Sequence, residues 1–252
     1  MKIRFFLLFN FVLNLSFAQQ SNIVTERPFA SASSSTIPAK TIQLETGYEY
    51  AQSKAGRVES EYISYNSSLL RFGLLENFEL RLGIGYNSEK VKSDIKPVDV
   101  TGWTPLTLGT KIFVTKEKGW RPEISFIGNL TLPSTGNEYF QPEKVKPDFR
   151  FAFTHTFGDH FVLAYNLGLE WPHVANDDVL GVYTVIVGYI ITDRLSCFIE
   201  NYGFVDSEYS IDAGFIYLLK HNFQLDLYGG FGLNSGSPDE FIGLGFSWRI
   251  PQ

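Results

Sequence analysis

LLRFGLLENFELRLGIGYN, residues 69–87, alternates apolar residues with charged residues and glycines. From Phe78 onward every second residue is apolar, and the residues between them are Glu79, Arg81 and two glycines. A period of two is that of a β-strand whose two faces meet different surroundings. The polar pair Glu76–Asn77 interrupts the pattern, so the stretch predicts two antiparallel strands joined by a tight turn.

The same alternation recurs along the whole chain and predicts twelve strands. They are expected at 41–50, 69–75, 78–86, 106–114, 120–132, 149–153, 161–169, 179–191, from about 195, 209–217, 223–231 and 242–250. Short turns alternate along the chain with longer polar loops. The short turns are LLEN, KEKG, FGDH, ITDR and LKHN. The loops are expected at 52–60, 88–102, 133–147, 171–178, 205–208 and 234–239. Short turns at one end and longer loops at the other are typical of an outer-membrane barrel, and an even strand count puts both termini at the periplasmic end.

The beginning of the chain has the features of a cleaved signal peptide. Residues 1–18 combine positive charge at Lys2 and Arg4, the apolar run FFLLFNFVLNL and the small-x-small sequence Ser16–Ala18. We therefore expect three parts: a signal peptide at 1–18, an N-terminal segment at 19–40, and a barrel at 41–252. Beyond residue 18 no run of about 18 apolar residues predicts a transmembrane helix.

The amino-acid composition agrees with a β-rich protein and argues against several kinds of partner and site. Aromatic residues make up 16% of the 252, and Phe, Tyr and Gly number 23, 13 and 22. Phe and Tyr are enriched in strands. The net charge of −6, with no basic stretch, argues against nucleic acid as a partner. The single cysteine, Cys197, excludes an internal disulfide and a multi-cysteine metal site.

A soluble β-sandwich also alternates, so the two all-β folds must be compared. The polar face of a sandwich meets water, whereas the polar face here is rich in glycine and carries both signs of charge, as in a crowded lumen. Aromatic residues also fall near strand ends, as in the girdles of a membrane barrel. They are Tyr86, Trp103 and Trp171 at one end and Phe72, Phe78, Phe157, Phe161 and Trp248 at the other. The pattern therefore favours a transmembrane, antiparallel, up-and-down β-barrel in the outer membrane.

An ordered set of segments resembles one known family. The segments are RPFASASSSTIPAKTIQLETGYEY from Arg27, LLRFGLLENFELRLGIGY from Leu69, LTLGTKIFV from Leu106, LTLPSTG from Leu130 and FIGLGFSWRI from Phe241. Together they are similar to the outer-membrane transporters named after the meta-pathway of phenol degradation, over essentially the whole mature chain. The resemblance implies a barrel in the outer membrane and transport of small molecules. It implies no catalytic or binding residues.

If the polar faces point inward, the lumen collects many charged side chains. These lumen-lining candidates are Glu45, Glu49, Arg71, Glu79, Arg81, Lys111, Arg121, Glu123, Asp148, Arg150, Glu170, Asp212 and Asp226. One interpretation is a polar passage that mildly prefers cations, and the other is a salt-bridged filling that closes the barrel. Unpaired charges in a narrow lumen are costly, so pairing is expected in both cases. Twelve strands enclose less water than the roughly 16–18 of general porins, which favours the filling.

The segment 19–40 has two interpretations as well. Its SASSS run favours a flexible periplasmic leader, because Ser-rich segments rarely form a core. The alternative is a small plug inside the lumen.

Neither an enzyme nor a metalloprotein is expected, and no cofactor is implied. The four histidines, His155, His160, His173 and His221, have no metal-ligand spacing, and no Ser-bearing nucleophile motif stands out. We expect passive transport of small or hydrophobic solutes through or along the barrel. The alternatives are a closed barrel with a structural or surface-interaction role, and, less favoured, an outer-membrane hydrolase. The expected partners are outer-membrane lipid, the barrel-assembly machinery during biogenesis and a small solute.

Overall fold

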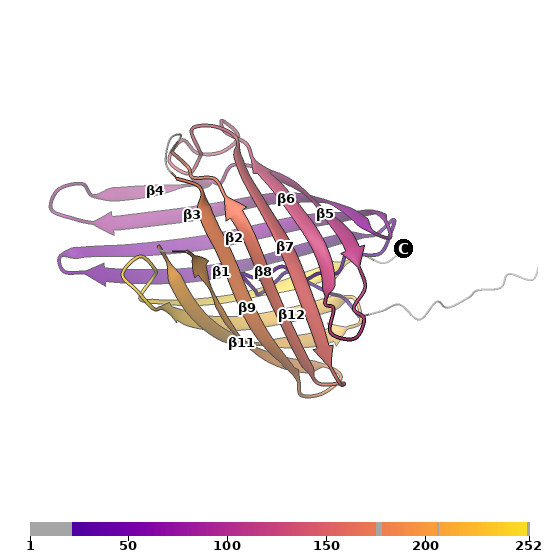
Figure 1. The fold of residues 1–252 in the computed structure, drawn as a ribbon. Coiled ribbons are helices and arrows are strands. Elements are labelled where there is room, and N and C mark those ends of the chain that lie inside the picture. The colour runs from indigo at the N-terminus through magenta and orange to yellow at the C-terminus, as the bar shows by residue number, and fades with distance from the viewer. Residues whose placement is uncertain (1–21, 175–177, 206, 251–252) are drawn as a thin grey trace, which may run out of the picture.

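In the computed structural model the described residues form thirteen β-strands in one antiparallel sheet (Figure 1). The residues described are 22–174, 178–205 and 207–250, and the predicted signal peptide lies outside them. The strands are β1 (Ile42–Ala55), β2 (Val58–Leu75), β3 (Phe78–Lys92), β4 (Val98–Trp103), β5 (Thr107–Thr115), β6 (Glu123–Thr131), β7 (Lys146–Phe157), β8 (Phe161–Glu170), β9 (Leu180–Ile190), β10 (Leu195–Phe204), β11 (Tyr209–Lys220), β12 (Phe223–Gly232) and β13 (Glu240–Arg249). No helix in these ranges is long and apolar enough to span a bilayer.

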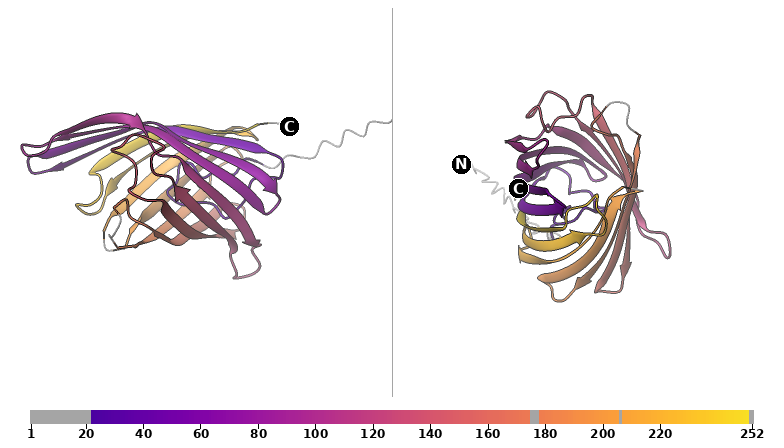
Figure 2. Two further views of the ribbon diagram at one scale, coloured as in Figure 1. Left: turned by 90° about the horizontal axis from the view of Figure 1, so that it is seen from above. Right: turned by 90° about the vertical axis from the view of Figure 1, so that its left-hand side faces the viewer.

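The sheet closes into a barrel of twelve strand positions. β1 pairs with β13, and the additional pairing of β2 with β3 joins the two ends of the sheet. β4 and β5 share one position, because β5 pairs with β3 at Phe78–Gly83 and β4 pairs with it at Tyr86–Val91. The predicted twelve-stranded barrel is therefore confirmed, with one position divided into two strands. The right-hand view of Figure 2 looks into the ring of strands, and the left-hand view shows the barrel from the side.

Side chains alternate across the barrel wall as the sequence predicted. On β12, Gln224, Asp226 and Tyr228 are buried, whereas the intervening Leu225 and Leu227 are exposed on the outer surface. An exposed apolar belt is what a lipid bilayer requires, and closure leaves no unpaired strand edge in the hydrocarbon. Aromatic side chains at the two ends pack in pairs, such as Tyr86 with Trp103 at the long-loop end.

Two of the predicted loops are partly strand. The stretch 88–102 was expected as a loop, but β3 continues to Lys92 and β4 begins at Val98. Likewise, the expected loop 52–60 is a hairpin in which only Gly56 and Arg57 separate β1 from β2. These hairpins project beyond the rest of the barrel (Figures 1 and 2). Polar residues predominate in the ends of β1 and β3 and at the start of β2, and β4 is short, so these parts show less alternation than the other strands.

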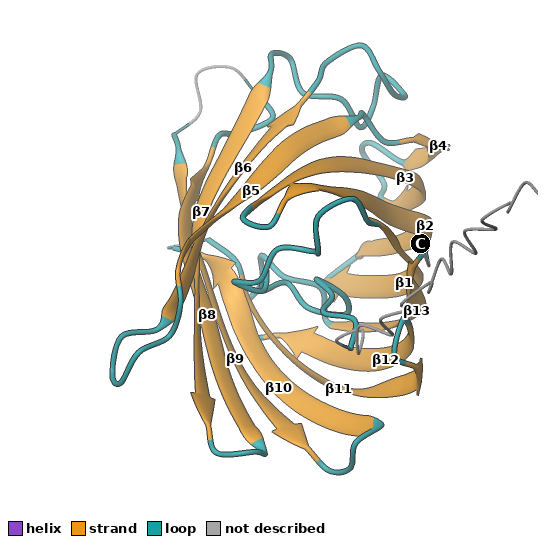
Figure 3. Ribbon diagram, turned by 90° about the vertical axis from the view of Figure 1, so that its right-hand side faces the viewer, coloured by secondary structure: helices purple, strands orange, loops and turns teal. Residues whose placement is uncertain are grey.

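The short turns fall where they were predicted, between β2 and β3, β5 and β6, β7 and β8, β9 and β10, and β11 and β12. By the general orientation of outer-membrane barrels this end is periplasmic. Residues 22–40 enter the barrel from this end, where the amide of Ile23 donates to the carbonyl of His221. These residues have no regular secondary structure and lie within the ring of strands (Figure 3). We call residues 22–40 the luminal segment.

Candidate functional site: a lumen occupied by the N-terminal segment

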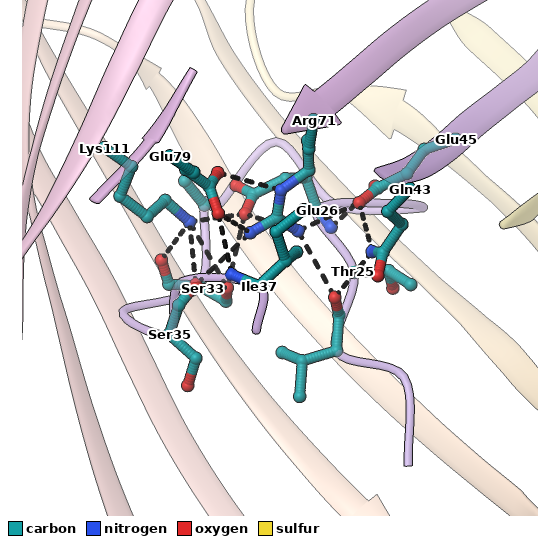
Figure 4. A network of polar contacts seen from close by, with 12 residues as sticks. Thr25, Glu26, Ser33, Ser35, Ile37, Gln43, Glu45, Arg71, Glu79 and Lys111 are labelled. Carbon is teal, nitrogen blue, oxygen red and sulfur yellow. Dashed lines mark hydrogen bonds and ion pairs between the residues drawn. The ribbon is translucent and has the colours of Figure 1, made fainter. Parts of the chain in front are cut away.

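Arg71, on the inner face of β2, is the centre of a buried network of charges (Figure 4). Its Nη2 lies 2.8 Å from Oε2 of Glu79, and its Nη1 lies 2.9 Å from Oε1 of Glu45. The same Nη1 is 3.4 Å from Oε1 of Glu26, which belongs to the luminal segment. One guanidinium therefore joins two strands of the wall to the segment inside it.

Two further cations complete this network. Nζ of Lys111 on β5 lies 2.5 Å from Oε1 of Glu26 and donates to the carbonyl of Ser33 at 2.7 Å. Nη1 of Arg81 lies 3.3 Å from Glu79 and 3.6 Å from Glu26. The charged cluster thus consists of Arg71, Arg81, Lys111, Glu26, Glu45 and Glu79, and its formal charges cancel. Burial of charge is tolerated only with such pairing, so the cluster fixes Glu26 in place.

Wall carboxylates also accept hydrogen bonds from the backbone of the luminal segment. The amides of Glu26 and Arg27 donate to Oε2 of Glu45, at 2.8 and 3.1 Å. The amides of Ala30 and Ser31 donate to the carboxylate of Glu200, at 2.9 and 2.7 Å. A buried segment without secondary structure must find acceptors for its N–H groups elsewhere, and the lumen supplies them.

The serine run of the luminal segment makes side-chain hydrogen bonds to the wall. Oγ of Ser31 donates to Oγ1 of Thr184 at 2.6 Å, and Oγ of Ser34 lies 2.7 Å from Oγ1 of Thr154. Ser34 and Ser35 each donate to Glu123 at 2.9 Å. Small hydroxyl side chains fit a narrow polar lumen, so a composition that usually indicates disorder here suits a buried surface.

Arg27 anchors the segment on the adjoining part of the wall, where β1, β13 and β12 lie side by side. Its Nη2 lies 2.9 Å from Oδ1 of Asp226 on β12, and its guanidinium lies 5.8 Å from the centre of the Tyr228 ring. Gly47 and Gly245 give it room, because a Cβ on either would overlap the guanidinium. Glycine at these two inner positions therefore lets the Arg27 guanidinium approach the wall this closely.

Two cavities lie against the luminal segment. The outer cavity, of about 480 Å³, lies toward the long-loop end and is lined by Glu49, Tyr62, Tyr202, Asp212 and Tyr228 among others. The inner cavity, of about 340 Å³, lies toward the short-turn end and is mostly apolar. Its lining residues include Ile23, Phe29, Ala164, Ile186, Phe198 and Ile216. Phe29 borders both cavities, and its ring meets that of Phe198 edge-on at 4.8 Å.

The structure divides the thirteen lumen-lining candidates into groups. Five of them, Glu45, Arg71, Glu79, Arg81 and Lys111, form the charged cluster together with Glu26. In a second group near the long-loop end, Arg150 forms ion pairs with Asp148 and Glu170, and Glu170 also pairs with Lys146. Glu49, Glu123, Asp212 and Asp226 lie elsewhere on the inner wall. Arg121 lies in the exposed turn between β5 and β6, with Nη2 near the carbonyl of Lys116.

Several residues of the site were not among the candidates. Glu26 and Arg27 precede the first strand, in a segment whose composition favoured a leader, and Glu200 lies on a strand whose faces were not assigned. Its neighbours Phe198 and Tyr202 share its inward face. Because two aromatic residues flank the carboxylate at a spacing of two, alternation groups Glu200 with residue types that usually face lipid, so the pattern did not identify it as a lumen residue.

The histidines lie at strand ends and in connections. His155 Nδ1 is 4.0 Å from Glu117, and Nδ1 of His160 is 2.8 Å from the carbonyl of Ile190. Within the described ranges, no group of three or more His, Cys, Asp or Glu side chains is arranged to hold a metal ion.

The charge on Glu26 makes the position of the luminal segment sensitive to acid. Burial raises the pKa of Glu26, but attraction to Lys111, Arg81 and Arg71 outweighs it and holds the pKa well below the ordinary 4.5. A carboxyl group with a lowered pKa contributes stability above its ordinary pKa, and the contribution is lost as the pH falls toward the lowered value.

Glu26 stays ionised above about pH 5, so we expect the thermal unfolding midpoint of the refolded protein to change little with pH in that range on its account. Below about pH 5 the midpoint should decrease as Glu26 takes up a proton. The substitution Glu26→Gln should lower the midpoint at neutral pH and make its acid slope shallower, as measured by gel mobility after graded heating. Glu138→Gln, in an exposed loop, is the matched control and should reproduce the wild-type profile. Equal acid slopes for the wild type and Glu26→Gln would contradict the assigned role.

The fold and the lumen define the class of protein. A closed twelve-position antiparallel barrel with an apolar outer belt, aromatic ends and a charged interior is an outer-membrane β-barrel. A family model described as "Putative MetA-pathway of phenol degradation" matches residues 25–250, and the chain belongs to this family. The resemblance noted in the sequence is thereby confirmed. No curated protein sequence matches the chain.

Solved structures show the same fold. The COG4313 outer membrane channel from Pseudomonas putida F1 is similar with a TM-score of 0.69 at 14% identity, over 88% of this chain and 100% of that one. The β domain of the Bordetella autotransporter Brka has a TM-score of 0.53 at 8% identity, over 84% and 100%. The NanC porin has a TM-score of 0.50 at 7% identity, over 83% and 100%. These matches are channels, porins and autotransporter domains rather than enzymes.

Proposed function

We propose that the protein is a passive channel for small solutes, and that residues 22–40 form a plug that must shift before a solute passes. One observation carries this proposal: the luminal segment lies between two cavities inside one barrel. The outer cavity is polar and the inner cavity is apolar. A route through both cavities suits small molecules that have a polar group and an apolar part. The similar protein from Pseudomonas putida F1 is named an outer membrane channel, which supports the same interpretation.

The contacts of the segment favour a plug that moves. Apart from Ile23, Phe29 and Ile37, its contacts with the wall are mainly hydrogen bonds and ion pairs, which water can replace. The apolar contacts that make a core permanent are few here. The segment is therefore held firmly while it is docked, without a large hydrophobic cost to release.

Single-channel recording of the refolded chain from Gln19 in a planar bilayer tests the proposal. We expect a closed baseline with brief openings and a mild preference for cations, because carboxylates predominate around the outer cavity. A difference in mobility between boiled and unboiled gel samples would first show that the barrel is folded. Folded protein that stays silent at all voltages, in liposomes that solutes do not enter, would instead indicate a closed barrel with a structural role.

A further inference from the structure

The inner wall beside the outer cavity carries two carboxyl groups directly opposite each other. Glu200 on β10 pairs in register with Asp212 on β11, and both side chains point inward. They are 1% and 4% exposed. Like charges at directly opposed positions of an antiparallel pair destabilise a sheet, so something must compensate this arrangement.

The luminal segment compensates only one of the two carboxylates. Glu200 accepts the amides of Ala30 and Ser31. Oδ1 of Asp212 is buried and has no hydrogen-bond partner in the part of the chain that the structure describes. Nor does any described cation lie within ion-pair distance of Asp212, which lines the outer cavity. An unsatisfied buried carboxylate is costly, and Asp212 is one of the residues that line a cavity large enough for a ligand.

The unsatisfied groups of the cavity wall share one chemical character. Among the described carboxylates that line it, Oε2 of Glu26 and Oδ1 of Asp212 are buried acceptors without a donor. Glu49 accepts the Tyr228 hydroxyl at 2.6 Å and has no cation within ion-pair distance among the residues described. Ionised carboxylates only accept hydrogen bonds, so the complementary ligand is a donor with positive charge.

The aromatic residues of the cavity narrow the choice of cation. Tyr62, Tyr202 and Tyr228 contribute to its lining, and the faces of such rings attract cations. The Arg27 guanidinium over Tyr228 is an instance within the same lumen. A bare metal ion would need several ligands converging on one point, and the described residues offer no such group. A tyrosine-lined cavity with separated carboxylates instead suits an organic cation, whose body packs on the rings while its ammonium group donates.

We infer that the outer cavity is a binding site for a small primary ammonium compound with a compact apolar body, and that Asp212 is its principal counter-ion. This goes beyond the proposed function, because the cavity lies on the long-loop side of the luminal segment and binding does not require the segment to move. The site is one where a cationic solute would be retained before any passage.

Calorimetric titration of the refolded chain in detergent at neutral pH tests this inference with a matched set of probes. Benzylamine, which is protonated at this pH, should bind saturably with one site per chain. Benzyl alcohol has the same shape without the charge and should bind at least about tenfold more weakly, because hydrogen bonds to charged groups are stronger than those between neutral ones. Asp212→Asn should weaken benzylamine binding by a similar factor.

Two controls separate this result from a loss of fold. Asp212→Asn removes the repulsion with Glu200, so the unliganded variant should melt at or above the wild-type temperature. Asp94→Asn, the same change in the exposed β3–β4 loop, should leave benzylamine affinity unchanged. Equal affinities for benzylamine and benzyl alcohol, no saturable binding, or unchanged affinity in Asp212→Asn would each overturn the inference and leave water as the occupant of the cavity.

Discussion

A disulfide between the luminal segment and the barrel wall is expected to abolish every channel opening. The hydroxyl oxygens of Ser31 and Thr184 are 2.6 Å apart, so cysteines at these positions would have Cβ atoms near the roughly 4 Å separation that a disulfide spans. The variant combines Ser31→Cys and Thr184→Cys with Cys197→Ser, because Cys197 lines the neighbouring cavity. Oxidised protein should be silent, and reduction should restore the opening frequency of the Cys197→Ser background. The measurement is single-channel recording before and after a reductant is added.

A second disulfide serves as the control for oxidation itself. Ser88 and Thr101 face each other across the β3–β4 hairpin, with hydroxyl oxygens 3.0 Å apart. Cysteines there should form a cross-strand disulfide that leaves conductance unchanged in both redox states. If the chain with its segment locked to β9 conducts as well when oxidised as when reduced, passage does not depend on movement of residues 22–40.

Arg71→Met is expected to destabilise the barrel strongly. Methionine keeps much of the side-chain volume but leaves Glu45 and Glu79 buried without their main cation. Breaking a buried ion pair by removal of one partner costs about 3–5 kcal/mol. Equilibrium unfolding in urea, with the barrel reconstituted in lipid vesicles, measures the loss.

Arg57→Met provides the comparison at the surface. Arg57 lies 3.6 Å from Asp94, but its side chain is 91% exposed, and exposed pairs contribute little to the free energy of unfolding. The double variant Arg71→Met with Glu79→Gln should recover part of the loss, because one uncompensated carboxylate is removed with the cation. If Arg71→Met lowers the free energy of unfolding by no more than Arg57→Met does, the cluster does not hold ionised carboxylates.

The barrel itself could be predicted from sequence because the bilayer imposes one rule on every spanning strand. Leu225 and Leu227 must meet lipid while Gln224 and Asp226 meet the interior, so the period of two persists through β12. The rule weakens on β9, where Val182 and Ile186 are buried on the inner face and Val185 and Val187 face lipid. Both faces are apolar there because the inner one borders the apolar inner cavity, which no periodicity could show.

The inward orientation of the charged cluster could be predicted, but its partners could not. Alternation places Arg71 and Glu79 on one face, whereas the depth of each side chain in the lumen depends on strand register. The more important omission was Glu26, which belongs to a segment without any periodic pattern. A Ser-rich stretch lacks the apolar residues that signal burial, yet the surface that receives it is itself polar and charged.

The luminal segment is continuous with β1, and this connection sets how quickly a vacated lumen can be filled again. Near the junction, the amide of Lys40 donates to the carbonyl of Gly73, and the amide of Gly73 donates to that of Thr41. A displaced segment therefore remains tethered at the rim, at an effective concentration on the order of millimolar for a short flexible link. Re-entry is an intramolecular event, independent of how many copies the membrane holds. In the channel proposed above, each barrel would therefore close again with its own N-terminal segment after every passage and would need no other molecule to do so.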